Sequence, residues 1–162
     1  MAKTSYSTAN GRIRRQLQEA IHACHEKKGE DISVLRLGPH SAAFTDYFVL
    51  CTGTNPRQIQ AISDEVETRL ERSGLKPAHT EGYKQADWVL LDYVDFVIHV
   101  FSPKARSFYD LERLWKSATP LDPGNLKALP SADKRSAAGG ARVRRTARST
   151  AASARRSKRR KG

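Results

Sequence analysis

Apolar residues recur at a spacing of three or four in three stretches of the chain, a pattern typical of amphipathic helices. The first stretch begins at Ile13 and ends at residues 27–29, where two lysines and a glycine predict a helix end. The second begins at Asn55, which can cap a helix, and Pro56, which suits a first helical position. The third is predicted for residues 102–118. The three apolar faces are Ile13, Leu17, Ala20, Ile21 and Cys24; Ile59, Ile62, Val66 and Leu70; and Phe108, Leu111, Trp115 and Ala118.

Between these helices the apolar residues alternate or run continuously, as in β-strands. Strands are predicted at residues 31–37, 46–53, about 87–92 and 95–101, with a short edge strand near 76–80. The order α-β-β-α-β-β-β-α predicts an α/β fold with a small mixed β-sheet and about three helices. Three helices cannot easily cover both faces of such a sheet. We therefore expect an uncovered apolar region, which is typical of an interaction site.

The two ends of the chain lie outside this pattern. Residues 1–12 are expected to be a flexible N-terminus ahead of a globular domain at residues 13–118. Residues 119–130 contain three prolines and predict a linker that can dock a leucine or two. Residues 131–162 are mainly Ala, Ser and Arg with almost no large apolar residue, so we expect a disordered tail.

Charge is concentrated in this tail. The whole chain has a formal net charge of +12, while residues 131–162 contain twelve Lys or Arg and one acid, Asp133. No aromatic residue is available there to stack on bases, so contact with phosphates and no sequence preference are expected. A solvated tail without a dedicated ligand is the alternative. The candidate RNA-contact residues are Arg142, Arg144, Arg145, Arg148, Arg155, Arg156, Lys158, Arg159, Arg160 and Lys161.

Cysteine usage and hydropathy narrow the class of protein. Cys24 and Cys51 lie in different predicted elements and form no CxxC pair, so we expect two reduced, buried thiols. No apolar run reaches the roughly 18 residues of a membrane span, and no signal-peptide pattern follows the N-terminus. These features predict a cytoplasmic protein without membrane contact. A mitochondrial or plastid location is the alternative, because residues 1–15 are basic and rich in hydroxyl groups.

Polar residues offer little catalytic chemistry. His22 and His25 lie one helical turn apart, but no further ligand cluster follows, which favours a surface pair over a metal site. Asp92 and Asp95 could bind Mg²⁺ for nucleotidyl transfer. They lie three residues apart across a turn, however, so their carboxylates need not point to one site. His99 has no nucleophile at a suggestive spacing, so a half-buried or partner-facing histidine is favoured over a general base. We therefore predict no enzymatic activity, no metal and no cofactor.

Three sequence blocks within about residues 13–118 form a specific pattern: FTDYFVLCTGTNPRQIQAISDEV, EGYKQADWVLLDYVDFVIHVF and RSFYDLERLW. In this order and spacing they resemble the ribosomal silencing factor family, also called Iojap or RsfS. The resemblance implies a nucleotidyltransferase-like fold that is catalytically degenerate. It also implies binding to the large ribosomal subunit at its L-fourteen protein (uL-fourteen), which blocks joining of the small subunit and represses translation under nutrient limitation. An organellar branch of the family makes large-subunit assembly the alternative function.

The resemblance also implies which residues contact the partner. The partner-facing tryptophan of the family falls on Trp88, for which a core position is the alternative. Alternation along a strand places Trp88 and Leu90 on one face, so one of the two neighbouring leucines must be core. An uncovered sheet face would also favour a homodimer off the ribosome. The implied partner-binding residues are Trp88 as an aromatic anchor, Leu90 or Leu91 (whichever faces out) as an apolar contact, and His99, Arg106 and Tyr109 for polar orientation of the partner.

Two features depart from the family pattern. Val94 stands where the hairpin of the family usually has glycine, and tight two-residue turns need a positive φ that is costly for a β-branched residue. A wider turn is therefore expected. The basic tail lies outside the pattern altogether, and we expect it to add affinity for rRNA.

Deletion of residues 131–162 is expected to weaken binding to the large ribosomal subunit mainly at low salt, because phosphate contacts are screened as salt rises. Binding of the full chain and the truncated chain to purified large subunits, measured over a series of salt concentrations, tests this expectation. Equal affinities at every salt concentration would contradict it.

Overall fold

The computed structural model describes residues 2–126, with the backbone alone for residues 2–8. Each predicted strand is present, with bounds within about three residues of those expected. The helices and strands in chain order are α1 (Ala2–Glu26), β1 (Glu30–Arg36), β2 (Tyr47–Thr52), α2 (Pro56–Arg72), β3 (His79–Glu81), β4 (Trp88–Asp92), β5 (Phe96–Phe101), α3 (Pro103–Tyr109), α4 (Leu111–Leu114) and β6 (Thr119–Leu121).

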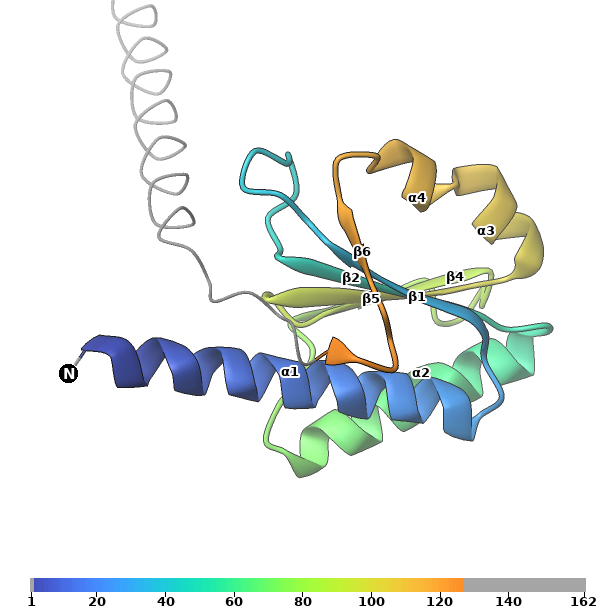
Figure 1. Cartoon of the computed structure of the whole chain (residues 1–162). Coiled ribbons are helices and arrows are strands. Elements are labelled where there is room, and N and C mark those ends of the chain that lie inside the picture. Colours follow the sequence, from blue (N-terminus) through green and yellow to red (C-terminus); the bar gives the residue numbers. More distant parts are fainter. Residues whose placement is uncertain (1, 127–162) are drawn as a thin grey trace, which may run out of the picture. The chain divides into compact units, whose positions relative to one another are not determined.

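The six strands form one mixed sheet in the order β3-β4-β5-β2-β1-β6, with helices on both faces (Figure 1). β2 and β5 are parallel neighbours, and every other pair is antiparallel. Every residue of β2 and β5 is buried, as expected of strands that are covered on both faces. The predicted α/β class with a small mixed sheet is confirmed.

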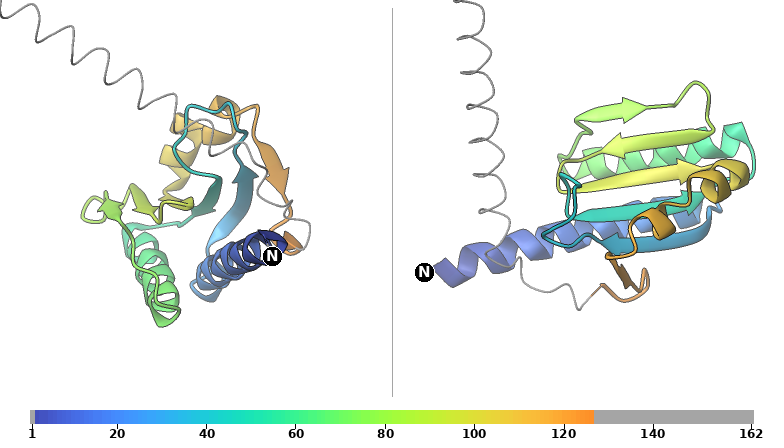
Figure 2. Two further views of the ribbon diagram at one scale, coloured as in Figure 1. Left: turned by 90° about the vertical axis from the view of Figure 1, so that its left-hand side faces the viewer. Right: turned by 90° about the horizontal axis from the view of Figure 1, so that it is seen from above.

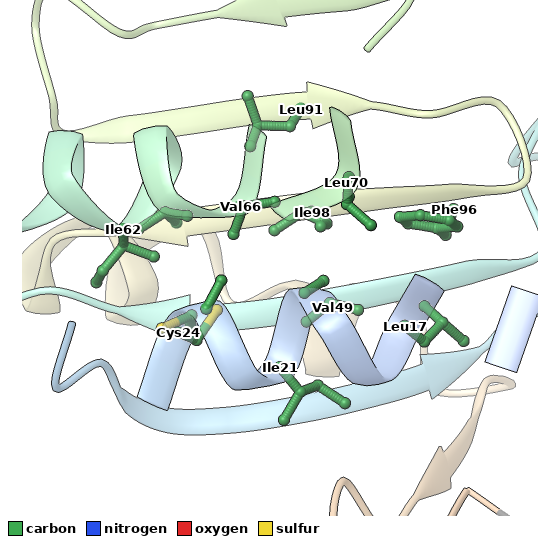
Figure 3. Close-up of a cluster of buried hydrophobic side chains, with 14 of the residues drawn as sticks. Leu17, Ile21, Cys24, Val49, Ile62, Val66, Leu70, Leu91, Phe96 and Ile98 are labelled. Carbon is green, nitrogen blue, oxygen red and sulfur yellow. The ribbon is translucent and has the colours of Figure 1, made fainter. Parts of the chain in front are cut away.

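Helices α1 and α2 lie side by side on one face of the sheet (Figure 2). The Asn55 side chain accepts a hydrogen bond from the Gln58 N–H at 2.9 Å, and Pro56 occupies the first turn of α2 as predicted. The apolar faces of both helices pack on the sheet and form the larger hydrophobic cluster (Figure 3). Its central members are Leu17, Ile21, Cys24, Val49, Ile62, Val66, Leu70, Leu91, Phe96 and Ile98.

The two cysteines lie together inside this cluster. Cys24 on α1 and Cys51 on β2 are both free and fully buried, as predicted. A hydrogen bond with the Cys51 thiol, and burial, raise the pKa of the Cys24 thiol. Both thiols therefore act as small apolar core groups.

The opposite face of the sheet has a smaller cluster and less cover. Its buried residues lie on β1, β2, β5, α3 and α4, while Trp88 and Leu90 of β4 are only half-buried against it. Figure 1 shows α3 and α4 on this side of the sheet, opposite α1 and α2. The buried members are Leu35, Leu37, Phe48, Leu50, Val97, Phe101, Ala105 and Leu111.

Three boundaries differ from the sequence prediction. The first helix begins at Ala2, where a flexible segment was expected over residues 1–12. The predicted third helix is divided at Asp110, which adopts a left-handed backbone with φ 42°. Part of the predicted linker is strand β6, an edge strand that tolerates Pro120, and Leu126 beyond it is buried in the larger cluster.

The β4–β5 turn is tight, so the expectation of a wider turn is wrong. Only Val94 and Asp95 separate Tyr93 from Phe96, and the Tyr93 N–H donates to the Phe96 carbonyl at 2.9 Å. Val94 adopts φ 72°, and its N–H donates to the Asp92 carboxylate at 2.8 Å. The turn therefore holds a β-branched residue in a conformation that favours glycine.

We expect Val94→Gly to raise the free energy of unfolding by about 1 kcal/mol. The strain of a non-glycine residue at positive φ, about 1–3 kcal/mol, exceeds the conformational entropy cost of glycine, about 0.5–1 kcal/mol. Val94 is 62% exposed, so its side chain contributes little packing. Urea denaturation measures the change, and Val94→Ala should recover only part of it. A Val94→Gly protein less stable than the parent would contradict the expectation.

Candidate protein-binding site

Exposed apolar side chains gather on the less covered side of the sheet. Phe108, Leu114 and Tyr109 on α3 and α4 are 79%, 70% and 46% exposed. Tyr109 contacts Trp88, and Phe108 contacts Tyr109. Trp88 and Leu90 are half-buried against the smaller cluster. We call this surface the docking face; its residues are Trp88, Leu90, Phe108, Tyr109 and Leu114.

Trp88 is the centre of an aromatic group on the docking face. Its ring centroid lies 4.6 Å from that of Tyr109 and 5.1 Å from that of Phe101, against which it stacks. The indole N–H donates a hydrogen bond to Nδ1 of His99 at 3.0 Å. Trp88 therefore has one side fixed by the fold and another side open, so it belongs to the core and to the surface at once.

His99 serves Trp88 from inside the protein. It is 3% exposed, so in this structure it reaches the docking face through Trp88, and its predicted part in partner binding stays a prediction. Burial, and to a smaller extent the charge of Arg106, lower the pKa of His99 to about 3. The ring is therefore neutral, and because Nδ1 accepts the indole hydrogen bond, its proton lies on Nε2.

Leu90 and Leu91 point to opposite faces of β4. Leu90 is half-buried beside Trp88, whereas Leu91 is fully buried in the larger cluster under α2. Alternation along the strand therefore decides the choice that the sequence left open. Leu91 is a core residue and is withdrawn as a partner-binding candidate.

Arg106 is engaged within the fold. Its guanidinium forms an ion pair with Glu112 and donates hydrogen bonds to Thr52 Oγ1 at 3.1 Å and Ser33 Oγ at 3.5 Å. Its side chain is 16% exposed. The predicted role in orienting the partner is replaced by an internal one, which fixes α3 and α4 to β1 and β2.

Two features of the docking face were missed by reading the sequence. Phe108 was placed on the buried face of one long helix, but the break at Asp110 turns it to solvent. Gly82 has φ 77°, and a Cβ added there would lie 2.0 Å from the carbonyl oxygen of Trp88. Glycine is therefore needed for the close approach that seats Trp88, and the glycine in the block EGYKQADW was the available signal.

The candidate catalytic residues hold structural or surface positions. One Asp92 carboxylate oxygen is occupied by the Val94 N–H, as a turn residue would be. His22 and His25 are exposed on α1. Among residues 2–126, no group of three or more His, Cys, Asp or Glu is placed to hold a metal ion. No helix of this range is long and apolar enough to cross a membrane. The candidate rRNA-contact residues of the tail lie outside the described residues.

Comparison with known proteins identifies relatives over most of the chain. The family model described as "Ribosomal silencing factor during starvation" (RsfS) matches residues 10–159. That range includes most of the basic tail. The expectation that the tail lies outside the family pattern is therefore wrong. The chain is 40% identical to the ribosomal silencing factor RsfS of Bacillus subtilis over 106 residues, which are 65% of this chain and 89% of that protein.

Two further matches concern the fold and an organellar relative. A crystal structure from Chromobacterium violaceum superposes with a TM-score of 0.61 at 30% identity, covering 75% of this chain and 96% of that one. A mouse protein named "Mitochondrial assembly of ribosomal large subunit protein 1" is 31% identical over 98 residues, which are 59% of this chain and 42% of that protein.

His99 makes a pH dependence of stability testable. Its pKa is about 3 in the folded protein and about 6.5 when unfolded, so below pH 6.5 the unfolded chain binds a proton that the folded chain excludes. Stability is therefore lost as the pH falls. From pH 7 to pH 5 we expect the parent to lose about 2 kcal/mol more than His99→Gln, which keeps an acceptor for Trp88 but does not titrate. Urea midpoints at both pH values measure this, and parallel losses would contradict it.

Proposed function

The chain belongs to the ribosomal silencing factor family, and on that premise we propose that it binds the large ribosomal subunit at its L-fourteen protein (uL-fourteen). The observation that carries this proposal is the docking face, an apolar surface that contains a half-buried tryptophan in contact with the exposed Tyr109. Tryptophan and tyrosine are enriched at the few positions that dominate protein–protein binding energy. The opposite face is covered by α1 and α2 and offers no comparable surface among the described residues.

We propose a steric mechanism. A domain seated on the large subunit where the small subunit joins excludes the small subunit by volume alone and represses translation under nutrient limitation. Such a mechanism consumes no cofactor and needs no catalytic residue. It needs affinity, because the domain competes with subunit joining: a micromolar dissociation constant corresponds to about −8 kcal/mol.

The fixed geometry of Trp88 favours binding. A free tryptophan side chain would lose rotamer freedom on docking, at a cost of about 0.5–1.5 kcal/mol. Here the hydrogen bond to His99 and the stacking on Phe101 hold the ring before the partner arrives. Much of that ordering cost is therefore met during folding.

A role in assembly of the large subunit is the second candidate function, supported by the name of the mouse relative. The same docking face would serve either role, because both begin with binding to the large subunit. A cytoplasmic location, contact of the tail with rRNA and a homodimer off the ribosome remain predictions.

We expect Trp88→Ala to weaken binding to the large subunit at least about tenfold, because a tryptophan at the centre of an interface commonly supplies 2 kcal/mol or more. Purified protein is added to separated subunits, and sucrose gradients score two quantities: the fraction of protein that sediments with the large subunit, and the fraction of subunits that fail to join. The variant should lose both activities together.

Tyr83→Ala is the matched control, because Tyr83 is an aromatic residue 37% exposed whose hydroxyl binds Asp64 of α2, away from the docking face. It should bind and silence as the parent does. Urea denaturation of Trp88→Ala separates lost contact from lost folding. A folded Trp88→Ala protein that still blocks subunit joining at parental concentrations would refute the proposal.

A further inference from the structure

Three cations on α3, on α4 and just after α4 are free to meet a ligand. Lys104, Arg113 and Lys116 are exposed, and none forms an ion pair with another residue that the structure describes. The neighbouring Arg106 is different, because it is held by Glu112. Glu112 is neutralised in this way. Two acids of the described residues remain nearby: Asp110 at the break, and Asp87, whose carboxylate accepts a hydrogen bond from the Ser102 hydroxyl at the start of α3. The three cations outnumber them.

Exposed apolar groups are interleaved with these cations. Lys104 lies one helical turn before Phe108, so both side chains project from the same side of α3. Arg113 adjoins Leu114 beyond the break at Asp110. The Phe108 ring is 79% exposed and meets Tyr109 only edge to face, at 5.0 Å and 87°. An open aromatic ring among unpaired cations is typical of surfaces that stack on unpaired bases and contact phosphates.

The fold holds these groups in place. The Ser102 Oγ caps α3 by accepting a hydrogen bond from the Ala105 N–H at 3.0 Å, and the Ser102 N–H donates to the Asp87 carbonyl at 2.8 Å. The ion pair of Arg106 with Glu112 spans the break between the two helices. The segment is therefore a rigid platform, and Tyr109 joins it directly to Trp88.

We propose that residues 103–116 bind an unpaired loop of rRNA next to the protein contact at Trp88. Lys104, Arg113 and Lys116 contact phosphates of the loop, and Phe108 stacks on one of its bases. This inference rests on the proposed function, because the large subunit brings RNA and protein together at one surface. The docking face would then bind where ribosomal protein and rRNA meet, with Trp88 in contact with the protein and α3–α4 in contact with the RNA.

The test replaces the three cations with glutamine in the full chain (Lys104→Gln, Arg113→Gln and Lys116→Gln together). Binding is measured to large subunits across a salt series and to the isolated, RNA-free L-fourteen protein. We expect several-fold weaker binding to the subunit at low salt. The slope of log affinity against log salt should fall by about 2, since each single-strand phosphate contributes about 0.7. Affinity for the isolated protein should be unchanged.

The matched control removes the same charge elsewhere: Arg57→Gln, Arg72→Gln and Lys84→Gln together, all exposed and outside α3–α4. It should retain the parental salt slope; an equal fall in both triple variants would overturn the proposal. An equal loss of affinity for the isolated protein would also overturn it, because the cations would then meet acidic side chains. An unchanged slope with the subunit would overturn it as well.

The proposed stacking of Phe108 on a base is tested separately, by two substitutions of this residue. Phe108→Tyr keeps an aromatic face and should bind the subunit as the parent does, whereas Phe108→Leu keeps apolar area alone and should bind several-fold more weakly. Equal binding by both variants would remove the stacking role. Trp88→Ala distinguishes the two proposals: if it binds the subunit and the isolated protein normally, the protein contact fails, whatever the salt slope of the triple variant.

Discussion

The fold depends on covering the central strands β2 and β5 on both faces. These strands are buried at every residue, so each face of the sheet needs apolar cover. Two long helices supply it on one face, and two short helices supply it on part of the other. Strand β4, the second strand from one edge of the sheet, lies under that incomplete cover, with Val89 and Leu91 in the core and Trp88 and Leu90 half-buried. The docking face thus follows from how little of this sheet face the helices within residues 2–126 cover.

A buried histidine beneath an open tryptophan is costly unless it is neutral and hydrogen-bonded. The fold meets both conditions for one ring nitrogen: burial holds the His99 pKa near 3, and Nδ1 accepts the Trp88 indole hydrogen bond. Phenylalanine in this position would pack without that cost. It would, however, leave the indole N–H without this partner and the ring of Trp88 held by stacking alone. Burial of His99 lowers stability, and in return its hydrogen bond fixes the orientation of Trp88.

Periodicity was enough to predict the strands, α2 and the class of the sheet, because burial on one or two faces leaves a direct mark on the sequence. It could not predict the break at Asp110, since a non-glycine residue in a left-handed conformation carries no pattern of its own. The same break explains why Phe108 was misplaced. Family blocks located Trp88, Leu90 and Tyr109, but residues inside a block share its pattern whether they face a partner or the core. Only the geometry separates Leu91 and Arg106 from them.

Arg106 shows how charge is divided on this side of the molecule. Arg106 is used within the fold: its guanidinium binds Glu112, Thr52 and Ser33, and these contacts connect the helices to the sheet. The three cations around it have no such partners among the described residues and remain in water. A residue held within the fold cannot also meet a ligand without breaking its own network, whereas an exposed cation loses little when it meets a phosphate. The exposed side chains, which the fold does not need for its own stability, are therefore the ones available for binding. Internal residues such as Arg106 hold the helices that carry them in place.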